Sequence, residues 1–478
     1  MDQSRIPLYE ALISHANQEP VSFHVPGHKY GHLSPFVESG PFSYILRIDA
    51  TELSGLDDLH APEGAILEAE GLLADLYKVK KSYFLVNGST VGNLAMVMAA
   101  CSEDDVVLVQ RNCHKSILNA LNLSKARPVF LEPDYNQDWQ VASEVSFSTV
   151  KQAIQLYPEA KALILTYPNY YGMVFDLSKM IEEAHNHHIP VLVDEAHGAH
   201  FIVGSPFPAS AVELGADVVV QSAHKTLPAM TMGSYLHFNS EILSLDKVKT
   251  YLSMLQSSSP SYPIMASLDI SRSFIAGYEQ KDATYLFAEI QGFKKELECI
   301  PALKVLEFED HQGDVLKVTV QSQCGYSGFE LQSEFERQAI YTEMADPNNI
   351  LFILPLLKAG QHYPLEESVS KIKQALKGFP VHSVKRAREI EGPKISELAI
   401  AFKEMSCLEE KVLPIKMAGQ HVCSETIIPY PPGIPLLLKG ERITIEKLDQ
   451  LQHLLASGAR FQGGSLLKQG LIKVFSTT

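Results

Sequence analysis

The sequence contains little cysteine, and its cysteines form no paired motif. The six are far apart, with no C-x-x-C pair: Cys101, Cys113, Cys299, Cys324, Cys407 and Cys423. This spacing argues against a disulfide framework and favours reduced thiols in a reducing compartment. The chain also lacks an apolar run of the roughly 20 residues that span a bilayer, and residues 1–20 lack the apolar core of a signal peptide. We therefore expect a cytoplasmic protein without a membrane partner.

Positive charge is also scarce. The chain has 40 Lys and Arg against 56 Asp and Glu, which gives a formal net charge of −16. No basic run is dense enough to follow a phosphate backbone, so nucleic acid is not expected as a partner. The phosphate-binding patterns G-x-x-x-x-G-K-[ST] and G-x-G-x-x-G are absent as well, which argues against the common kinds of nucleotide binding.

Short apolar runs that alternate with helical patterns are present from about residue 82 onward. Such alternation predicts an α/β fold with a mostly parallel sheet covered by helices on both faces, and the continuous apolar character of several runs predicts strands buried on both sides. We predict seven strands in one large sheet: residues 82–87 (SYFLVN), 105–110 (DVVLVQ), 128–131 (PVFL), 162–166 (ALILT), 190–194 (PVLVD), 217–221 (DVVVQ) and 234–238 (SYLHF).

The length of 478 residues favours two or three domains. After about residue 270 the pattern changes to longer helices and weaker strands, such as residues 315–320 and 350–354, which indicates a smaller α/β domain. From about residue 381 the chain is rich in Lys and Glu and contains a proline-dense loop, residues 430–435 (YPPGIP). The predicted organisation is an N-terminal segment (1–30), a major domain (31–290), a small α/β domain (291–380) and a C-terminal domain (381–478).

Polar residues directly follow four of the predicted strands, at residues 87–90 (NGST), 112–114 (NCH), 194–197 (DEAH) and 222–225 (SAHK). Ligands of parallel sheets gather at the carboxyl ends of the strands. We therefore expect these four segments to face one crevice.

Residues 87–90 stand between a strand and an apolar helical run at residues 91–100. Their backbone N–H groups and the hydroxyls of Ser89 and Thr90 would face the positive end of that helix, as a phosphate seat requires. An ordinary capped helix would use the same residues, because Ser and Thr favour that position.

Asp194 ends an all-apolar strand, where a carboxylate without a partner is costly. The protonated pyridine nitrogen of pyridoxal phosphate (PLP) would supply a cationic partner and keep the ring electron-withdrawing. An Asp that caps the next helix or holds a metal is the alternative. Ala196, two residues on, is small enough for a flat ring to lie against it.

Lys225 follows another apolar strand and precedes an apolar segment, residues 227–230 (LPAM). Burial and a neighbouring histidine would lower its pKa and free the amine to form an imine with an aldehyde. A solvated lysine on a loop is the alternative. The combination with Asp194 and the phosphate seat favours the imine. His114, after a further strand, could stack on an aromatic ring, although a single histidine is more often structural.

With these residues in place, the chain resembles the ornithine/lysine/arginine decarboxylases of PLP fold type I, in the short bacterial form without the N-terminal wing domain. The resemblance extends from near residue 23 to near residue 441. Its motifs are residues 23–31 (FHVPGHKYG), 56–64 (LDDLHAPEG), 87–93 (NGSTVGN), 110–116 (QRNCHKS), 193–200 (VDEAHGAH), 221–227 (QSAHKTL), 257–269 (SSSPSYPIMASLD) and 430–435 (YPPGIP).

The resemblance implies a role for each candidate residue. Lys225 would carry PLP as a Schiff base, Asp194 would bind the ring nitrogen, and His114 and Ala196 would lie on the two faces of the ring. The phosphate would be held by Ser89, Thr90, Ser222 and His224. The run around Ser258 matches a segment that reaches the cofactor of the neighbouring subunit, so a homodimer or higher homo-oligomer is expected. The larger enzymes carry Trp at the position of His197, so the wall on the substrate side differs here.

The implied reaction is decarboxylation of a basic amino acid, with His224, Lys225 or His197 as the proton donor to the product carbon. Glu425 is the candidate for binding the distal cation of the substrate. Because the short members resemble arginine decarboxylases of polyamine synthesis, arginine, giving agmatine, ranks ahead of lysine and ornithine.

Two other readings stay open. Another fold type I enzyme, an aminotransferase or lyase, would use the same cofactor seat. A metal-dependent hydrolase is suggested by the histidines at 185, 187, 188, 197 and 200, but H-E-x-x-H is absent and histidine is favoured at a helix C-terminus. We therefore expect no metal.

Overall fold

The computed structural model describes residues 1–33, 40, 42–309, 312–382, 393–429 and 434–476. Within this part, the chain divides into two compact units, each built from two stretches of sequence. Unit 1 contains residues 1–99 and 190–280, and unit 2 contains residues 100–189 and 281–478. The predicted boundaries at residues 30, 290 and 380 stay a prediction.

All seven predicted strands form within one or two residues of their expected bounds. They are β1 (Lys81–Leu85), β2 (Val106–Gln110), β3 (Arg127–Leu131), β6 (Ala162–Thr166), β7 (Val191–Asp194), β8 (Val218–Gln221) and β9 (Ser234–Phe238). A further strand, β14 (Ile395–Glu397), pairs antiparallel with β3. It was missed because its residues are only partly buried and carry no apolar run.

In unit 1 the strands follow the order β1, β9, β8, β7. Strands β7 and β8 are parallel, whereas β9 runs antiparallel to both β8 and β1. Strand β1 therefore points the same way as β7 and β8, so that the carboxyl ends of all three meet at one edge. Helix α4 (Gly88–Ala100) packs closely on this sheet, because a Cβ at Gly92 would lie 2.7 Å from Leu85 Cδ1 and 2.8 Å from Val220 Cγ1.

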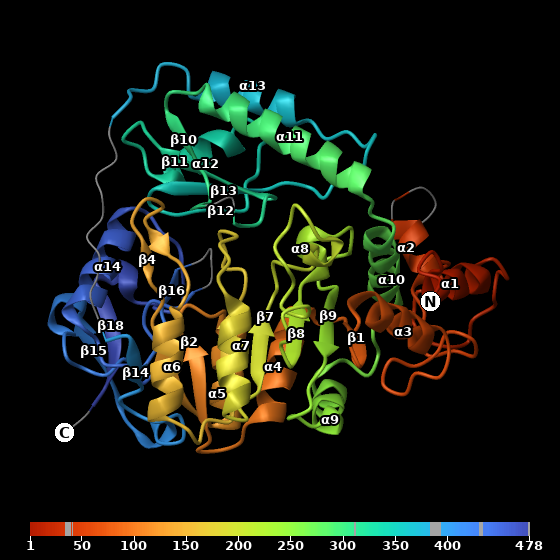
Figure 1. The fold of residues 1–478 in the computed structure, drawn as a ribbon, viewed down its shortest axis with the longest axis horizontal. Coiled ribbons are helices and arrows are strands. Elements are labelled where there is room, and N and C mark those ends of the chain that lie inside the picture. The colour runs from red at the N-terminus through yellow and green to blue at the C-terminus, as the bar shows by residue number, and fades with distance from the viewer. Residues whose placement is uncertain (34–39, 41, 310–311, 383–392, 430–433, 477–478) are drawn as a thin grey trace. The chain divides into compact units, whose positions relative to one another are not determined.

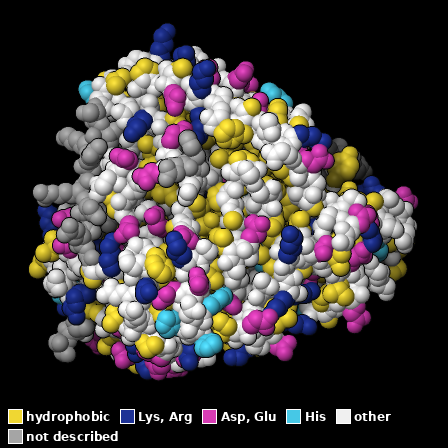
Figure 2. Space-filling view, viewed as in Figure 1, with side chains coloured by type: hydrophobic (Ala, Val, Ile, Leu, Met, Phe, Trp, Pro, Cys, Tyr) yellow, Lys and Arg dark blue, Asp and Glu magenta, His cyan; other side chains and the backbone are white. Residues whose placement is uncertain are grey.

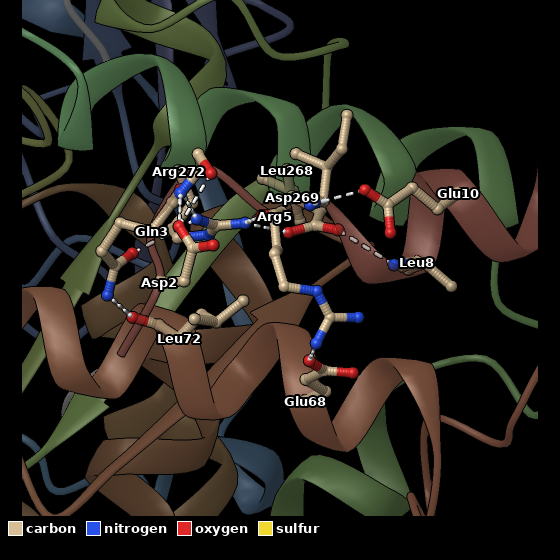
Figure 3. A network of polar contacts seen from close by, with 12 residues as sticks. Asp2, Gln3, Arg5, Leu8, Glu10, Glu68, Leu72, Leu268, Asp269 and Arg272 are labelled. Atoms are coloured by element: carbon tan, nitrogen blue, oxygen red, sulfur yellow. Dashed lines mark hydrogen bonds and ion pairs between the residues drawn. The ribbon is translucent and has the colours of Figure 1, made fainter.

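Three further helices of unit 1 lie together near the N-terminus of the chain, where α1 (Pro7–Ala16) contacts both α3 (Ala65–Tyr77) and α10 (Tyr262–Ala276) (Figure 1). Arg272 on α10 is fully buried and donates hydrogen bonds to the carbonyl oxygens of Gln3 and Arg5, and Asp269 accepts one from the backbone N–H of Leu8 (Figure 3). The first residues of the chain are thereby fixed to α10. Helices α2 (Phe42–Ile48) and α9 (Leu245–Leu255) complete the longer elements of this unit.

In unit 2 the strands of the larger sheet follow the order β6, β2, β3, β14, with β6, β2 and β3 parallel. Their connections contain α5 (Lys115–Ser124), the short pair β4 (Tyr135–Asn136) and β5 (Val141–Ala142), α6 (Phe147–Leu156) and α7 (Leu177–Asn186). Helix α7 is amphipathic, with Met180, Ile181 and Ala184 buried on one face and polar residues on the other.

Unit 2 also contains the expected small α/β region. Its antiparallel sheet has the order β10 (Leu303–Leu306), β11 (Lys317–Ser322), β13 (Asn349–Ile353), β12 (Met344–Ala345). Helices α11 (Gln280–Glu298), α12 (Gly328–Glu336) and α13 (Leu365–Ala375) lie on one side of it (Figure 1).

The C-terminal part of unit 2 has its own apolar core, centred on residues such as Ala418, Ile427, Leu451 and Ile472. It contains β15 (Glu410–Pro414), β16 (Ile428–Pro429), α14 (Ile445–Ala456), β17 (Phe461–Gln462) and β18 (Leu471–Phe475). Buried Arg111, just after β2, is bonded to this part through Glu441 at 2.9 Å and through the Pro435 carbonyl at 2.8 Å. The QRNCHKS motif therefore includes a structural ion pair that the sequence did not reveal.

The visible surface carries acidic and basic side chains intermixed, without a continuous basic stripe (Figure 2). None of the helices in the described ranges is long and apolar enough to cross a bilayer.

Candidate active site

Three of the four polar strand-end segments belong to unit 1, and direct contacts join them at the common carboxyl edge. Ser222 Oγ donates to Ser89 Oγ at 2.9 Å, and Asn93 Nδ2 donates to Asp194 Oδ2 at 2.8 Å. Since β1, β7 and β8 all end at this edge, the predicted convergence of the segments 87–90, 194–197 and 222–225 is present within unit 1. The fourth segment, residues 112–114, belongs to unit 2.

Asp194 is a nearly inaccessible carboxylate, with 3% of its surface exposed. Its Oδ2 accepts from Asn93, and its Oδ1 accepts from the backbone N–H of Ala196 at 3.2 Å. Both donors are neutral, and no described Lys, Arg or His forms an ion pair with Asp194. Because two neutral donors do not compensate a buried negative charge fully, the group is suited to a cationic ligand such as a pyridinium nitrogen.

Lys225 lies in the short helix α8 (Ala223–Thr226), and its Nζ is 3.0 Å from Nε2 of His197. The lysine is half-buried and His197 is buried. His224 is the sequence neighbour of Lys225, but its Nδ1 is directed to the Gly233 carbonyl at 2.9 Å. Since a carbonyl oxygen only accepts, Nδ1 of His224 carries the proton in this contact. His197 is therefore a direct partner of the lysine amine.

The proposed phosphate seat lies at the first turn of α4. The sequence predicted the helix from residue 91, but it begins at Gly88, so that Ser89 and Thr90 belong to its first turn. Gly88 has a positive φ of 75°, which permits the sharp turn from β1 into the helix. Ser222 is fully buried beside Ser89, whereas Thr90 is exposed. The first N–H groups of α4 have no partner inside the helix, which makes this turn suitable for an anion.

Ser258 is exposed in the run that was expected to reach a neighbouring subunit. The adjacent Ser257 donates its N–H to Asn87 Oδ1 at 3.3 Å, and its carbonyl is 2.9 Å from Nε2 of His60. His60 belongs to the LDDLHAPEG motif. This motif therefore holds the serine run beside the loop that begins α4.

Two predicted residues lie in unit 2. His114 is half-buried and caps α5, with its Nδ1 accepting from the N–H of Ser116 at 3.3 Å. Glu425 is also half-buried, and its carboxylate accepts from the N–H of Lys473 at 2.9 Å. Each therefore has a structural contact in addition to its predicted role. The first four residues of the YPPGIP motif, 430–433, lie outside the described residues.

Sequence reasoning missed two buried residues, one in this site and one directly next to Asp194 in the chain. Asn93 contacts Asp194, and a polar Asn inside the apolar run 91–100 could have indicated it. Glu195 is fully buried, and burial raises its pKa to about 8. The described residues contain no cluster of three or more His, Cys, Asp or Glu side chains that could hold a metal.

Comparison with known proteins identifies the family. The family model described as the Orn/Lys/Arg decarboxylase major domain matches residues 6–311, and that of the C-terminal domain matches residues 390–471. The chain belongs to the Orn/Lys/Arg decarboxylase family. The resemblance predicted from the motifs is thereby confirmed.

Relatives of this decarboxylase cover almost its whole length. The uncharacterized protein YaaO of Bacillus subtilis (strain 168) is 45% identical over 473 residues, with 98% of each chain covered. An arginine decarboxylase of the same organism is 32% identical over 477 residues, covering 97% of this chain and 96% of the relative.

Solved structures confirm the fold as PLP fold type I. The lysine decarboxylase LdcF of Francisella novicida has a TM-score of 0.79 at 20% identity, covering 98% of this chain and 81% of that one. A more distant likeness, to a structure titled SPT with PLP, has a TM-score of 0.53 at 16% identity over 66% of this chain and 77% of that one.

The enzyme is a PLP-dependent carboxy-lyase, as predicted. The residues in unit 1 fit the cofactor. A lysine amine, a buried carboxylate with two neutral donors, and a helix N-terminus flanked by hydroxyls are present at one sheet edge.

Proposed function

We propose that this decarboxylase converts L-arginine to agmatine and CO₂ in polyamine metabolism, with PLP bound covalently to Lys225. The observation that carries the cofactor assignment is the contact of Lys225 Nζ with His197 Nε2 at the edge where Asp194 is buried, with no cationic partner among the described residues. A half-buried lysine amine beside a histidine can react with an aldehyde, whereas a lysine on a surface loop is surrounded by water.

We assign the cofactor contacts as follows. Asp194 would hold the ring nitrogen in its protonated form, and Ala196 and His114 would lie against the two faces of the ring. Ser89, Thr90, Ser222 and His224 would bind the phosphate. Bound PLP supplies an electron sink for the carbanion left when CO₂ departs. The protein supplies orientation and charge. Asn93 and the Ala196 N–H each donate a hydrogen bond to the Asp194 carboxylate and so fix its orientation.

The protonation of the product carbon requires a donor near the reacting amine. Nζ of Lys225 and Nε2 of His197 are 3.0 Å apart, so a proton can pass directly between them. His224 is a third candidate. Its ring is fixed through the Gly233 carbonyl, so only its Nε2 could face a substrate.

The substrate ranking depends on the relatives. An arginine decarboxylase matches at 32% identity, whereas a lysine decarboxylase of Escherichia coli matches at 22% and with 79% of its length. This difference supports arginine, with lysine and ornithine as alternatives. Glu425 remains our candidate for the distal guanidinium. One of its oxygens already accepts from Lys473, and a carboxylate has capacity for a second, bidentate partner.

We further propose that the enzyme is a homodimer in which the run around Ser258 reaches the cofactor of the second subunit. Large apolar side chains of unit 1 are exposed in the single chain, including Phe23 at 96%, Val21 at 85% and Leu33 at 70%. Soluble monomers rarely leave several such side chains in one short segment uncovered, and a second copy would cover them.

The purified holoenzyme tests the function directly. Release of CO₂ and of the amine is measured with arginine, lysine and ornithine, and sodium borohydride is used to attach the cofactor irreversibly before peptide mass analysis. We expect the highest kcat/KM with arginine and the added mass on the peptide that contains Lys225, with none in Lys225→Ala. Equal or absent turnover of arginine would refute the substrate ranking. Exchange of amino groups without CO₂ would indicate an aminotransferase.

A further inference from the structure

A chain of buried polar side chains lies in unit 1 beside the proposed cofactor residues. It begins at Glu195, which is fully buried. The Glu195 carboxyl accepts hydrogen bonds from Gln221 Nε2 at 2.6 Å, Ser210 Oγ at 2.8 Å and the Ala211 N–H at 2.6 Å. These three hydrogen bonds offset part of the cost of burying the Glu195 carboxyl. Neither Glu195 nor Gln221 has a part in the chemistry proposed above.

The chain continues across two more strands. Gln221 Oε1 is 3.1 Å from His237 Nε2, and His237 Nδ1 is 2.8 Å from Ser82 Oγ. Because an amide oxygen only accepts, His237 donates from Nε2, and its Nδ1 then accepts from the Ser82 hydroxyl. Burial lowers the pKa of His237 to about 3, so the ring is neutral. The donors therefore all point in one direction, from Ser82 through His237 and Gln221 to Glu195.

The register of the strands places this chain on the face opposite to the cofactor residues. Asp194 pairs with Val220, and the N–H of Glu195 continues the ladder to the Val220 carbonyl at 2.9 Å. Since side chains alternate along a strand, Asp194 and Ser222 share one face, and Glu195 and Gln221 share the other. Each member of the pair is the direct sequence neighbour of a residue that we assign to the cofactor.

We propose that Glu195 and Gln221 form a brace, joined by their 2.6 Å hydrogen bond, that positions Asp194 and Ser222 for the cofactor. This inference rests on the proposed cofactor contacts. The brace connects the ends of β7 and β8 directly, so a change in it alters the separation of the ring-binding carboxylate and the phosphate-binding hydroxyl. Both are positioning residues, since neither side chain faces the site.

Two further observations support the brace. A Cβ at Gly198 would lie 2.7 Å from Glu195 Cγ, so the glycine of VDEAHGAH leaves the room that the Glu195 side chain occupies. In addition, burial raises the pKa of Glu195 to about 8, helped by the nearby Glu213. The hydrogen bonds from Gln221, Ser210 and the Ala211 N–H oppose this rise, so loss of the Gln221 contact would leave the buried carboxyl less well satisfied.

Because all hydrogen bonds of this chain run in one direction, we expect Glu195→Gln to reverse them. The new amide can donate to Gln221 Oε1, Gln221 Nε2 can then donate to His237 Nε2, and the His237 proton moves to Nδ1 and donates to Ser82. The whole chain reverses its direction while every contact is kept. Glu195→Met has a similar volume but makes no hydrogen bond, so it removes the brace.

The test compares Glu195→Gln, Glu195→Met and the control Glu241→Gln, whose carboxylate is exposed and lies outside this chain of hydrogen bonds, with wild-type holoenzyme. PLP affinity is measured by reconstitution, together with kcat for arginine and the pH titration of the cofactor absorbance. We expect Glu195→Met to weaken PLP binding at least about tenfold and to shift the absorbance titration. Glu195→Gln and Glu241→Gln should remain within about threefold of wild type.

Wild-type values for a folded Glu195→Met variant would overturn the brace. If that variant does not fold, Gln221→Asn takes its place, because the shorter amide cannot reach Glu195, and wild-type values there have the same consequence. ¹⁵N NMR of the His237 ring in Glu195→Gln gives an independent test: a proton that stays on Nε2 contradicts the chain. Failure of the wild-type enzyme itself to bind PLP or release CO₂ would refute the proposed function instead.

Discussion

At the residue scale, Asp194 illustrates how burial prepares a group for a ligand. Its carboxylate is withdrawn from water, and within the described part of the chain it accepts only from the Asn93 amide and the Ala196 N–H. Neutral donors orient a carboxylate without neutralising it. We therefore propose that this carboxylate is the partner of the ring nitrogen of PLP.

This charge gives the first prediction. Asp194→Asn should keep the shape of the site but lower kcat by about a hundredfold or more, because a neutral amide cannot hold the ring nitrogen protonated. The matched control is Asp217→Asn. Asp217 is also buried, but it directly precedes β8 and so lies at the edge of the sheet opposite to the site. Steady-state decarboxylation of arginine is measured for both. A kcat for Asp194→Asn no lower than that of the control would contradict the assignment.

Glu195 gives a prediction for stability against pH. Its folded pKa of about 8 exceeds the ordinary value of 4.5, so the folded state retains a proton that the unfolded chain has lost. The stabilising effect of this proton is complete below pH 4.5 and is lost as pH rises toward 8, by up to about 1.4 kcal/mol per pH unit. Glu195→Gln has no such proton. We measure urea unfolding at pH 5.5, 6.5 and 7.5 and expect the free energy of unfolding of this variant, relative to that of wild type, to increase with pH. A difference that stays constant over this range would show that Glu195 is ionised throughout.

At the element scale, helix α10 connects the start of the chain to the rest of unit 1. Arg272 pairs with Asp269 at 2.7 Å, both fully buried, and together they bind the backbone of residues 3, 5 and 8 (Figure 3). By contrast, Arg5 pairs with Glu68 where both side chains are about half exposed. The two ion pairs therefore differ in burial within one small region.

This contrast predicts very different costs of removal. Arg272→Met should destabilise the protein by about 3–5 kcal/mol, because it leaves Asp269 buried without its cation and frees the N-terminal segment. Arg5→Gln should cost less than about 1 kcal/mol, since its pair is screened by solvent. Urea unfolding of the two variants measures both values. Equal costs would mean that the buried pair is not the anchor of the N-terminal segment.

At the scale of the whole molecule, the apolar segment around Phe23 predicts association of two chains. Phe23→Asp would place a charge in the proposed interface, so the variant should dissociate and lose activity, whereas Leu156→Asp, at a 58% exposed position in unit 2, should do neither. Light scattering is the measurement. Wild type and control should have at least twice the chain mass of 52.9 kDa, and a dimeric, active Phe23→Asp variant would exclude this surface.

The sequence predicted most of the larger strands because their residues are apolar throughout, as burial on both faces requires. It missed β14, whose three residues form a strand only because β3 offers a free edge to pair with. It also placed the start of α4 three residues late, since Gly88 is a poor helix former by propensity but is required here for its positive φ.

The sequence by itself determined the family, the cofactor and the candidate residues, because those depend on residue types at strand ends and on motifs that are contiguous in the chain. Only the tertiary structure decided which groups touch. It placed His197 beside the Lys225 amine, Asn93 on Asp194 and Gln221 on Glu195. Such contacts join segments that are far apart in the chain, and their geometry follows from strand register and helix packing, which no local pattern records.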